Sequence, residues 1–366
     1  MTRRVKIFGA GSIGNHLANA ARHKGWAVDI VDRDKAALQR TKSDIYPKRY
    51  GKWDDAIGLF EGGSEPKDGY DLIFVGTPPD SHMDLARSAV RERPKAILVE
   101  KPLCTPDLAG AQELFEEARA AEVSVFVGYD HVVGRAAAKA ADLLRSGIIG
   151  PVLTLDVEFR EHWGGIFAAH PWLSGPEDSY LGYWKRGGGA CGEHSHALNL
   201  WQFFADTLGL GRVESVQATL KFVREGRVDY DDLCFAHLRT DKGLTGRVVQ
   251  DVVTEPARKW ARIQGKDGFI EWHCGYEPGV DLVRYKGADR ETGEMRFSKT
   301  RPDDFLQELS HIDEALNSRT AAQSPLALAR GLESMMVIAA AHKSTSDRRT
   351  VQIDYAKGFR PEALQA

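Results

Sequence analysis

The chain has 366 residues, of which 42% are hydrophobic and 28% are charged, and its formal net charge is -3. This length exceeds what a single hydrophobic core normally organises, so we expect two domains. The small net charge and the lack of a basic tract argue against nucleic acid or an anionic membrane as the main partner.

The sequence also limits the expected compartment. No stretch is long and apolar enough to span a bilayer, and the first residues lack the apolar segment of a signal peptide. The four cysteines, Cys104, Cys191, Cys234 and Cys274, are scattered without C-x-x-C spacing. That distribution fits a reducing compartment better than a disulfide framework or a zinc site. We therefore expect a cytoplasmic protein.

The first third of the chain alternates short apolar stretches with helical ones. Strands are predicted over residues 5–8, 27–31, 71–75, 96–99 and 123–127, and helices over 13–24, 81–92 and 107–121. Uniformly apolar strands separated by helices are typical of a parallel sheet that is covered on both faces. The pattern predicts a doubly wound Rossmann domain over residues 1–130.

The pattern changes after a further helix predicted over residues 136–146. Alternating polar and apolar residues predict strands over 152–160, 214–223, 232–238, 245–253, 259–264 and 280–285. Helices are predicted over 193–204, 303–317 and 326–343. Residues 131–366 are therefore expected to form an α+β domain with an open, mostly antiparallel sheet, which serves substrate binding and oligomerisation. Its last helix could pack on the first domain.

A glycine-rich turn follows the first predicted strand. Gly9, Gly11 and Gly14 form a G-x-G-x-x-G that opens the first helix, with Ser12 and Ile13 inside it. The first glycine permits the tight turn, the second lets the backbone approach a diphosphate, and the third allows close packing of helix and strand. Because helix N-termini bind anions, the turn predicts a dinucleotide cofactor.

Asp32 stands at the end of the second predicted strand, near the usual spacing from the glycine turn. A carboxylate there accepts hydrogen bonds from the ribose hydroxyls of NAD and repels the 2′-phosphate of NADP. The adjacent Arg33 could instead pair with such a phosphate. We predict NAD, with NADP as the alternative; a glycine turn beside a solvated aspartate is the purely structural interpretation.

Three further motifs follow in order. They are Thr77-Pro78-Pro79-Asp80-Ser81-His82, Glu100-Lys101-Pro102-Leu103, and Gly187-Gly188-Gly189 followed by Glu193, Ser195 and His196. With the glycine turn and the change from parallel to antiparallel sheet, they resemble the Gfo/Idh/MocA family of NAD(P)-dependent sugar and cyclitol oxidoreductases. The resemblance covers essentially the whole chain. It implies hydride transfer between nicotinamide and a secondary alcohol or ketone of a sugar, sugar acid or cyclitol.

Lys101 follows the carboxyl end of a parallel strand, where doubly wound sheets bind ligands. The resemblance implies that it is the catalytic lysine, whose ammonium group would stabilise a developing alkoxide near the nicotinamide. It also implies a cofactor cleft that includes Thr77, Pro78, His82 and Glu100. His82 falls within the following helix, so we expect it to be structural rather than catalytic. An isolated lysine before a proline would otherwise be a surface residue beside a turn.

Glu193, His196 and Asn199 are spaced three apart in an otherwise apolar predicted helix, and buried polar groups need partners or a function. The resemblance makes His196 the proton acceptor in alcohol oxidation and the donor in ketone reduction. Glu193 would contact substrate hydroxyls or orient His196, and all three are expected to bind substrate. A hydrogen-bonded core histidine is the alternative. Many relatives carry an aspartate near this histidine, where we find only Asn199 on the C-terminal side.

His194 and His196 form an H-x-H pair that could be taken for a metal site. Side chains two residues apart on a helix point in different directions, and hydride transfer to nicotinamide needs no metal. We therefore predict no metal ion.

The segment over residues 161–186 is irregular and rich in aromatic and basic side chains, which suits contacts with sugar rings. Substrate contacts are expected from Lys101, Tyr129, His131, Trp163, Tyr183 and Trp184. The same aromatics could instead anchor the loop or fill a subunit interface. An open sheet needs a cover on its second face, and the resemblance implies that such sheets form dimers or tetramers. We therefore expect a homodimer or homotetramer, with a small sugar-like substrate as its other partner.

Two other functions would use the same cofactor site. A redox-neutral enzyme could retain its NAD and oxidise and then reduce one sugar during epimerisation or glycoside cleavage. A non-catalytic regulator could sense NAD(H) without using Lys101 and His196, and the joint presence of these two residues counts against it.

Overall fold

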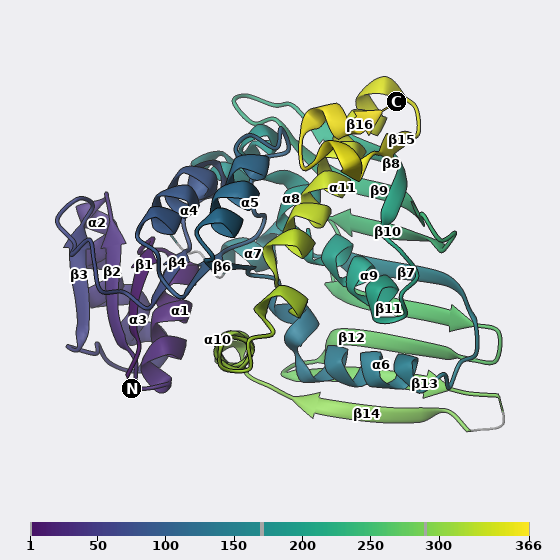
Figure 1. Cartoon of the computed structure of the whole chain (residues 1–366), viewed down its shortest axis with the longest axis horizontal. Helices are drawn as coiled ribbons and strands as arrows, with labels where there is room; N and C mark the ends of the chain where they lie inside the picture. Colours follow the sequence, from purple (N-terminus) through teal and green to yellow (C-terminus); the bar gives the residue numbers. More distant parts are fainter. Residues whose placement is uncertain (1, 169–171, 289–290, 366) are drawn as a thin grey trace.

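The computed structural model describes residues 2–168, 172–288 and 291–365, and Figure 1 shows its two sheets on opposite sides of a central group of helices. The predicted fold class is confirmed, because a parallel doubly wound sheet is followed by a mostly antiparallel one. No helix among the described residues is long and apolar enough to cross a membrane.

The first sheet has six parallel strands in the order β3-β2-β1-β4-β5-β6. They are β1 (Arg4–Phe8), β2 (Ala27–Asp32), β3 (Ile57–Glu61), β4 (Leu72–Val75), β5 (Ala96–Val99) and β6 (Ser124–Val127). Every residue of β4 and β5 is buried, as expected for strands covered by helices on both faces. The order reverses between β1 and β4, so this topology places its ligand crevice beyond the carboxyl ends of those strands.

The helices around this sheet include the three predicted ones and a segment that we did not predict. They are α1 (Ser12–His23), α2 (Lys35–Arg40), a π-helical turn η1 (Thr41–Ile45), α3 (Tyr46–Tyr50), η2 (Pro79–Ser81), α4 (His82–Arg91) and α5 (Ala111–Ala120). The chain then runs through η3 (Asp130–Val133) into α6 (Arg135–Arg145), the helix predicted over residues 136–146, which packs on the second sheet. The unpredicted part is α2 to α3, which brings residues 41–50 next to the glycine-rich turn. Asn15 and Thr41 join the two segments through a side-chain hydrogen bond of 3.0 Å.

The second sheet has ten strands in the order β14-β13-β12-β11-β7-β10-β9-β8-β15-β16. They are β7 (Val152–Arg160), β8 (Val213–Val223), β9 (Tyr230–Thr240), β10 (Thr245–Asp251), β11 (Arg258–Gly265), β12 (Phe269–Glu277), β13 (Val280–Lys286), β14 (Gly293–Ser298), β15 (Val351–Ile353) and β16 (Leu364–Gln365). Its pairs are antiparallel except for β7 and β10, which run parallel. Six of these strands were predicted; β12, β14, β15 and β16 were not.

The helix expected over residues 193–204 is present but begins three residues later, and Glu193 belongs to a separate short helix before it. α8 (Gly189–Glu193) ends at His194, whose ψ of 23° leaves the helical path, and α9 (His196–Thr207) begins two residues later. α8 contains two glycines, which favour helix poorly, and its Cys191 amide donates to Asp231 on β9 at 2.7 Å. Because α8 is tied to the sheet separately from α9, Glu193 and Asn199 do not share one continuous helix face.

Short helical turns and two long helices complete the chain. They are α7 (Trp163–Ala168), η4 (Pro176–Asp178), η5 (Tyr180–Gly182), η6 (Trp184–Arg186), α10 (Arg301–Asn317), η7 (Ala321–Gln323), α11 (Leu328–Asp347), η8 (Tyr355–Lys357) and η9 (Pro361–Ala363). The α10 helix packs against α1, and Arg3 donates a 2.7 Å hydrogen bond to Asp313 beside that contact.

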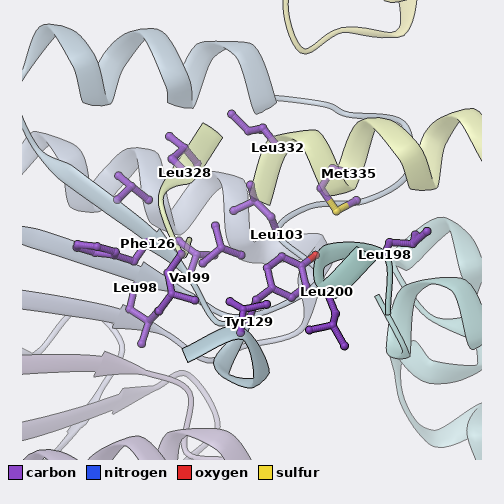
Figure 2. Close-up of a cluster of buried hydrophobic side chains, with 14 of the residues drawn as sticks. Leu98, Val99, Leu103, Phe126, Tyr129, Leu198, Leu200, Leu328, Leu332 and Met335 are labelled. Carbon is purple, nitrogen blue, oxygen red and sulfur yellow. The ribbon is translucent and has the colours of Figure 1, made fainter. Parts of the chain in front are cut away.

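The last helix, α11, packs on the edge strand of the first sheet. Val127 on β6 donates a backbone hydrogen bond of 2.8 Å to Leu326, and Gly331 lies so close to Val127 that a Cβ would come within 2.4 Å of it. Figure 2 shows apolar side chains of α11, the β5 and β6 strands and α9 in one buried cluster. The labelled members are Leu98, Val99, Leu103, Phe126, Tyr129, Leu198, Leu200, Leu328, Leu332 and Met335. This cluster fixes the ends of β5 and β6 relative to α9, which carries His196.

Candidate active site

The glycine-rich turn has the geometry that a dinucleotide cofactor requires. Gly9 has a φ of +106°, and a Cβ on it would lie 2.7 Å from the Gly76 carbonyl oxygen. A Cβ on Gly14 would lie 1.9 Å from the Gly9 carbonyl oxygen, whereas a Cβ on Gly11 would meet nothing within 4 Å. Gly9 and Gly14 are therefore needed for packing, and Gly11 leaves the open space into which a diphosphate could approach.

The turn is held by polar side chains from both sides. Asp32 accepts from the Ala10 amide at 2.8 Å and from the Asp34 amide at 2.9 Å, which fixes its carboxylate at the end of β2. Arg49 donates to the Ser12 hydroxyl at 2.8 Å and to its carbonyl at 3.0 Å. Arg33 is exposed beside Asp32. An additional cation therefore lies at the turn, in the helical segment that the sequence did not reveal.

The structure brings the three sequence motifs together. His82 is fully buried, and its two ring nitrogens face the Thr77 carbonyl at 2.7 Å and the Pro102 carbonyl at 3.0 Å. A Cβ on Gly187 would come within 2.8 Å of Pro79, so the triple glycine lies directly on the proline turn. His82 thus joins two loops through its ring. Pro78 lies exposed at the start of the same turn.

Lys101 reaches across to the second domain. Its Nζ lies 2.9 Å from the Glu193 carbonyl oxygen and 3.2 Å from Glu193 Oε2, and both side chains are more than four-fifths buried. Tyr180 donates to the same carboxylate at 3.4 Å. The neighbouring Glu100 is buried, and burial together with the charge of Asp130 raises its pKa to about 8. Lys101 therefore lies in a partly closed polar site beside a carboxyl group that is mostly protonated at neutral pH.

His196 lies at the start of α9 beside two residues of η3. Its Nδ1 is 3.7 Å from Asp130 Oδ1, which is itself 3.3 Å from His131 Nδ1. The rings of His131 and His196 have centroids 4.5 Å apart. Burial lowers the pKa of His196 well below its ordinary value, and the neighbouring His131 ring and the charge of Lys101 lower it further. Burial also lowers the pKa of His131, to about 3. Both imidazoles are thus neutral at pH 7.

One cavity of about 680 Å³ connects the glycine-rich turn with Lys101 and His196. Its volume lies in the range typical of small-molecule sites. Residues from both domains line it, including Ser12, Ile13, His16, Arg49, Lys101, His131, Glu161, Trp172, Glu193, His194, His196, Lys259 and Arg301. The predicted cofactor turn and the predicted catalytic side chains therefore open onto the same space.

Several residues of this wall were not predicted from the sequence. Glu161 at the end of β7 and Lys259 on β11 form an ion pair of 2.9 Å. Arg301 begins α10 and stacks over Phe305, and Asp130 lies behind His196. Their positions depend on strand pairing and on the return of α10, which leave no local signal in the sequence. Glu161 begins the 161–186 segment singled out above, and Asp130 lies between the predicted residues Tyr129 and His131.

Other predicted substrate residues lie away from the lining. Asn199 donates to Ser334 on α11 at 3.2 Å, and the indole of Trp184 donates to Asp229 at 3.2 Å. The Tyr183 hydroxyl donates to the Glu177 carbonyl at 3.4 Å. Trp163 is buried against Tyr230. These side chains tie the 161–186 segment and α9 to the fold.

Tyr129 occupies an intermediate position. It is 1% exposed and lies edge-on to the His196 ring, with the ring centroids 5.6 Å apart. Burial raises the pKa of its hydroxyl well above the ordinary value. Tyr129 therefore packs against the His196 ring.

The fold and this cavity define a class of proteins in which a dinucleotide-binding Rossmann domain is joined to an open antiparallel sheet, with a polar site between them. Two family models match the chain: the oxidoreductase family with an NAD-binding Rossmann fold over residues 3–129, and the GFO/IDH/MocA C-terminal domain over residues 137–271. The chain therefore belongs to the Gfo/Idh/MocA oxidoreductase family, as its motifs predicted.

Individual relatives are distant. Myo-inositol 2-dehydrogenase from Thermotoga maritima is 23% identical over 164 residues, which cover 43% of this chain and 45% of that enzyme. Levoglucosan dehydrogenase in complex with NADH has a TM-score of 0.77 at 17% identity, covering 96% of this chain and 99% of that one. An oxidoreductase from Agrobacterium radiobacter, in complex with NAD+, L-tartaric acid and magnesium, has a TM-score of 0.74 at 20% identity, covering 96% and 98%. These structural likenesses establish the shared fold.

Proposed function

We propose that this protein is an NAD(H)-dependent oxidoreductase that interconverts a secondary alcohol and a ketone on a sugar, sugar acid or cyclitol. One observation carries the proposal: a single cavity is lined by the glycine-rich turn on one side and by Lys101 and His196 on the other. A cofactor held at the turn and a substrate held at these side chains would share that space.

The residues at the turn fit NAD. Gly11 leaves room for the diphosphate, the first amides of α1 face it, and Arg49 adds a positive charge beside Ser12. Asp32 would accept from the adenosine ribose and would repel the 2′-phosphate of NADP. When bound, oxidised NAD supplies the acceptor for the hydride that leaves the alcohol carbon.

His196 and Lys101 supply the proton chemistry on the substrate oxygen. His196 is neutral at pH 7, so it can accept the hydroxyl proton as the C–H hydrogen leaves with its electron pair and the C=O bond forms. The Lys101 ammonium group, oriented by Glu193, stabilises negative charge on that oxygen. In the reverse direction, protonated His196 returns the proton to the alkoxide.

The cavity walls support a polyhydroxylated substrate. Glu161, Glu193, Lys259 and His131 offer hydrogen-bond donors and acceptors in several directions, and Trp172 adds an aromatic face. Rings with hydroxyl groups combine polar edges with C–H faces that pack on such a surface. The names of the myo-inositol and levoglucosan dehydrogenases among its relatives favour the same substrate class.

A spectrophotometric screen tests this function. NAD and NADP are each combined with hexoses, pentoses, hexuronates, aminosugars and inositols, and the absorbance of reduced nicotinamide is followed. We expect it to rise with NAD and one of these classes. If NAD binding is demonstrated but no sugar or cyclitol yields reduced nicotinamide, the proposed net dehydrogenase is wrong. Sugar conversion without reduced nicotinamide would identify the redox-neutral alternative.

We also propose that the protein is a cytoplasmic homodimer or homotetramer, with domains at residues 1–130 and 131–366. All four cysteines are free. Alternate residues of β8 and β9 are exposed, and they include Phe235, which is 45% exposed. A second copy would cover this face. Light scattering should give two or four times the chain mass of 40.5 kDa; the mass of one chain would contradict the assembly.

A further inference from the structure

The Asp130 carboxylate lies beside the rings of His131 and His196, although no residue near His196 in the sequence supplies a carboxylate on its C-terminal side. The Asp130 Oδ1 atom is 3.7 Å from His196 Nδ1 and 3.3 Å from His131 Nδ1. The side chain of Asp130 is 8% exposed. Among the described residues, Asp130 Oδ1 and His196 Nδ1 are both buried and lack a hydrogen-bond partner. A nitrogen and a carboxylate oxygen thus lie buried 3.7 Å apart, slightly beyond hydrogen-bond distance.

The backbone holds Asp130 in this position. Asp130 begins the η3 turn two residues after Gly128, where a Cβ would come within 2.8 Å of the Glu100 carboxyl group. Tyr129 packs edge-on against the His196 ring. Glycine at position 128 lets the chain pass the Glu100 carboxyl group without displacing it, and this path brings Asp130 to His196, the first residue of α9.

Charged and titratable groups surround this pair from every neighbouring element. The groups that lower the pKa of His196 are the imidazole of His131 and the cations Lys101, Lys259 and Arg301. The charge of Asp130 acts to raise the pKa of the carboxyl groups of Glu100, Asp304 and Glu308. The charge of Lys299 acts to lower the pKa of Asp304. Burial, and then the charge of Asp130, raises the pKa of Glu100, and burial likewise raises that of Glu308. At pH 7 the carboxyl group of Glu100 is therefore mostly protonated.

A metal ion is the competing interpretation of the same atoms. Asp130, His131 and His196 offer one ligand atom each within 4.8 Å of one another. The positive charges of Lys101, Lys259 and Arg301 lower the pKa of His196, and the same charges oppose a bound cation. A hydrogen bond between the ring and the carboxylate carries no such penalty.

We infer that Asp130 is a positioning residue that holds the proton of neutral His196 on Nδ1 and leaves Nε2 free to exchange a proton with the substrate oxygen. This inference rests on the proposed function. It follows because Nδ1 is the buried nitrogen that faces Asp130, while His196 also lines the cavity. A carboxylate on one nitrogen fixes the tautomer and stabilises the imidazolium that forms when the other nitrogen accepts a proton. Such hydrogen bonds are often long before substrate binds.

Nitrogen-15 NMR of the histidine rings tests the tautomer without any substrate. The chain has 12 histidines, and His196→Gln assigns the ring in question. At neutral pH, wild-type His196 should carry its proton on Nδ1. Asp130→Asn has the same shape, but its amide can donate to Nδ1, so the proton should move to Nε2. Asp130→Glu should restore the Nδ1–H form in part. Asp142→Asn is the matched control, because Asp142 is 66% exposed on α6.

The outcomes separate this inference from the proposed function. It is overturned if wild-type His196 carries its proton on Nε2, if Asp130→Asn leaves the tautomer unchanged, or if zinc binds with both rings as ligands. With a substrate from the screen, Asp130→Asn should lower kcat at least tenfold, with KM changed less than about threefold. A failed screen with the expected tautomers would refute the enzyme proposal and leave only the tautomer assignment of His196 in place.

Discussion

Lys101 Nζ lies 3.2 Å from Glu193 Oε2, although 92 positions of sequence separate the two residues. This ion pair joins the carboxyl end of β5 to the end of α8, and so connects the parallel sheet with the substrate side of the cavity. In the proposed function, this pair holds the Lys101 ammonium group beside the substrate oxygen.

Gly11 and Gly14 of the glycine-rich turn should respond differently to replacement by alanine. In Gly11→Ala the new Cβ enters open space, and the φ of -86° at this position suits alanine. The melting temperature without cofactor should therefore not change. The added methyl group would block the diphosphate, and the stabilisation by NAD should be lost. Gly14→Ala drives a Cβ into the Gly9 carbonyl and should cost about 1–3 kcal/mol of stability without any cofactor. Thermal shift with and without NAD distinguishes them; equal behaviour of the two variants would refute this assignment.

Asp32 has a structural and a recognition role that one substitution can separate. Asp32→Asn keeps an oxygen that can accept from the Ala10 amide, so the fold should be retained. The loss of the charge should weaken NAD about tenfold, which is about 1.4 kcal/mol, and should improve the affinity for NADP relative to NAD. Titration calorimetry with both cofactors measures this. An unchanged preference would show that Asp32 does not face the ribose.

The pH dependence of alcohol oxidation follows from the buried position of His196. The base must be neutral to accept a proton, and burial lowers its pKa well below 6.5. The fraction of neutral base therefore stays high as the pH falls from 8 to 6, and is lost only at lower pH. The kcat/KM profile for oxidation should accordingly be flat on its acid side down to about pH 6. An acid limb centred at or above pH 6.5 would contradict a buried His196 as the base.

The sequence predicted those parts of the fold that have strong local patterns. β4 and β5 are short, uniformly apolar strands, which are typical of a covered parallel sheet. The edge strand β3 was missed because Gly58 interrupts it and only Ile57 is fully buried. β14 was missed because its residues alternate between partly and fully exposed. Edge strands carry weaker apolar signals because one side of them faces solvent.

The site was predictable where a motif marks it, and not where long-range packing sets it. The glycine turn and Lys101 lie on the cavity because strand ends and turns place them there. Asp130 reaches His196 through the η3 turn, and Lys259 arrives by strand pairing, so spacing along the chain gave no sign of either. Conversely, Asn199 follows His196 by three positions but turns to Ser334, because α9 packs against α11.

The most direct test of the whole account is a stopped-flow measurement of hydride transfer, with NAD saturating and a substrate from the screen. The wild-type protein should form reduced nicotinamide in the first turnover. Lys101→Ala should bind NAD normally but form it at least about 10²-fold more slowly, since it lacks the cation beside the substrate oxygen. Lys95→Ala, which removes a 64% exposed lysine, should match the wild type. Hydride transfer by Lys101→Ala at the wild-type rate would contradict the assignment of this cavity as the active site.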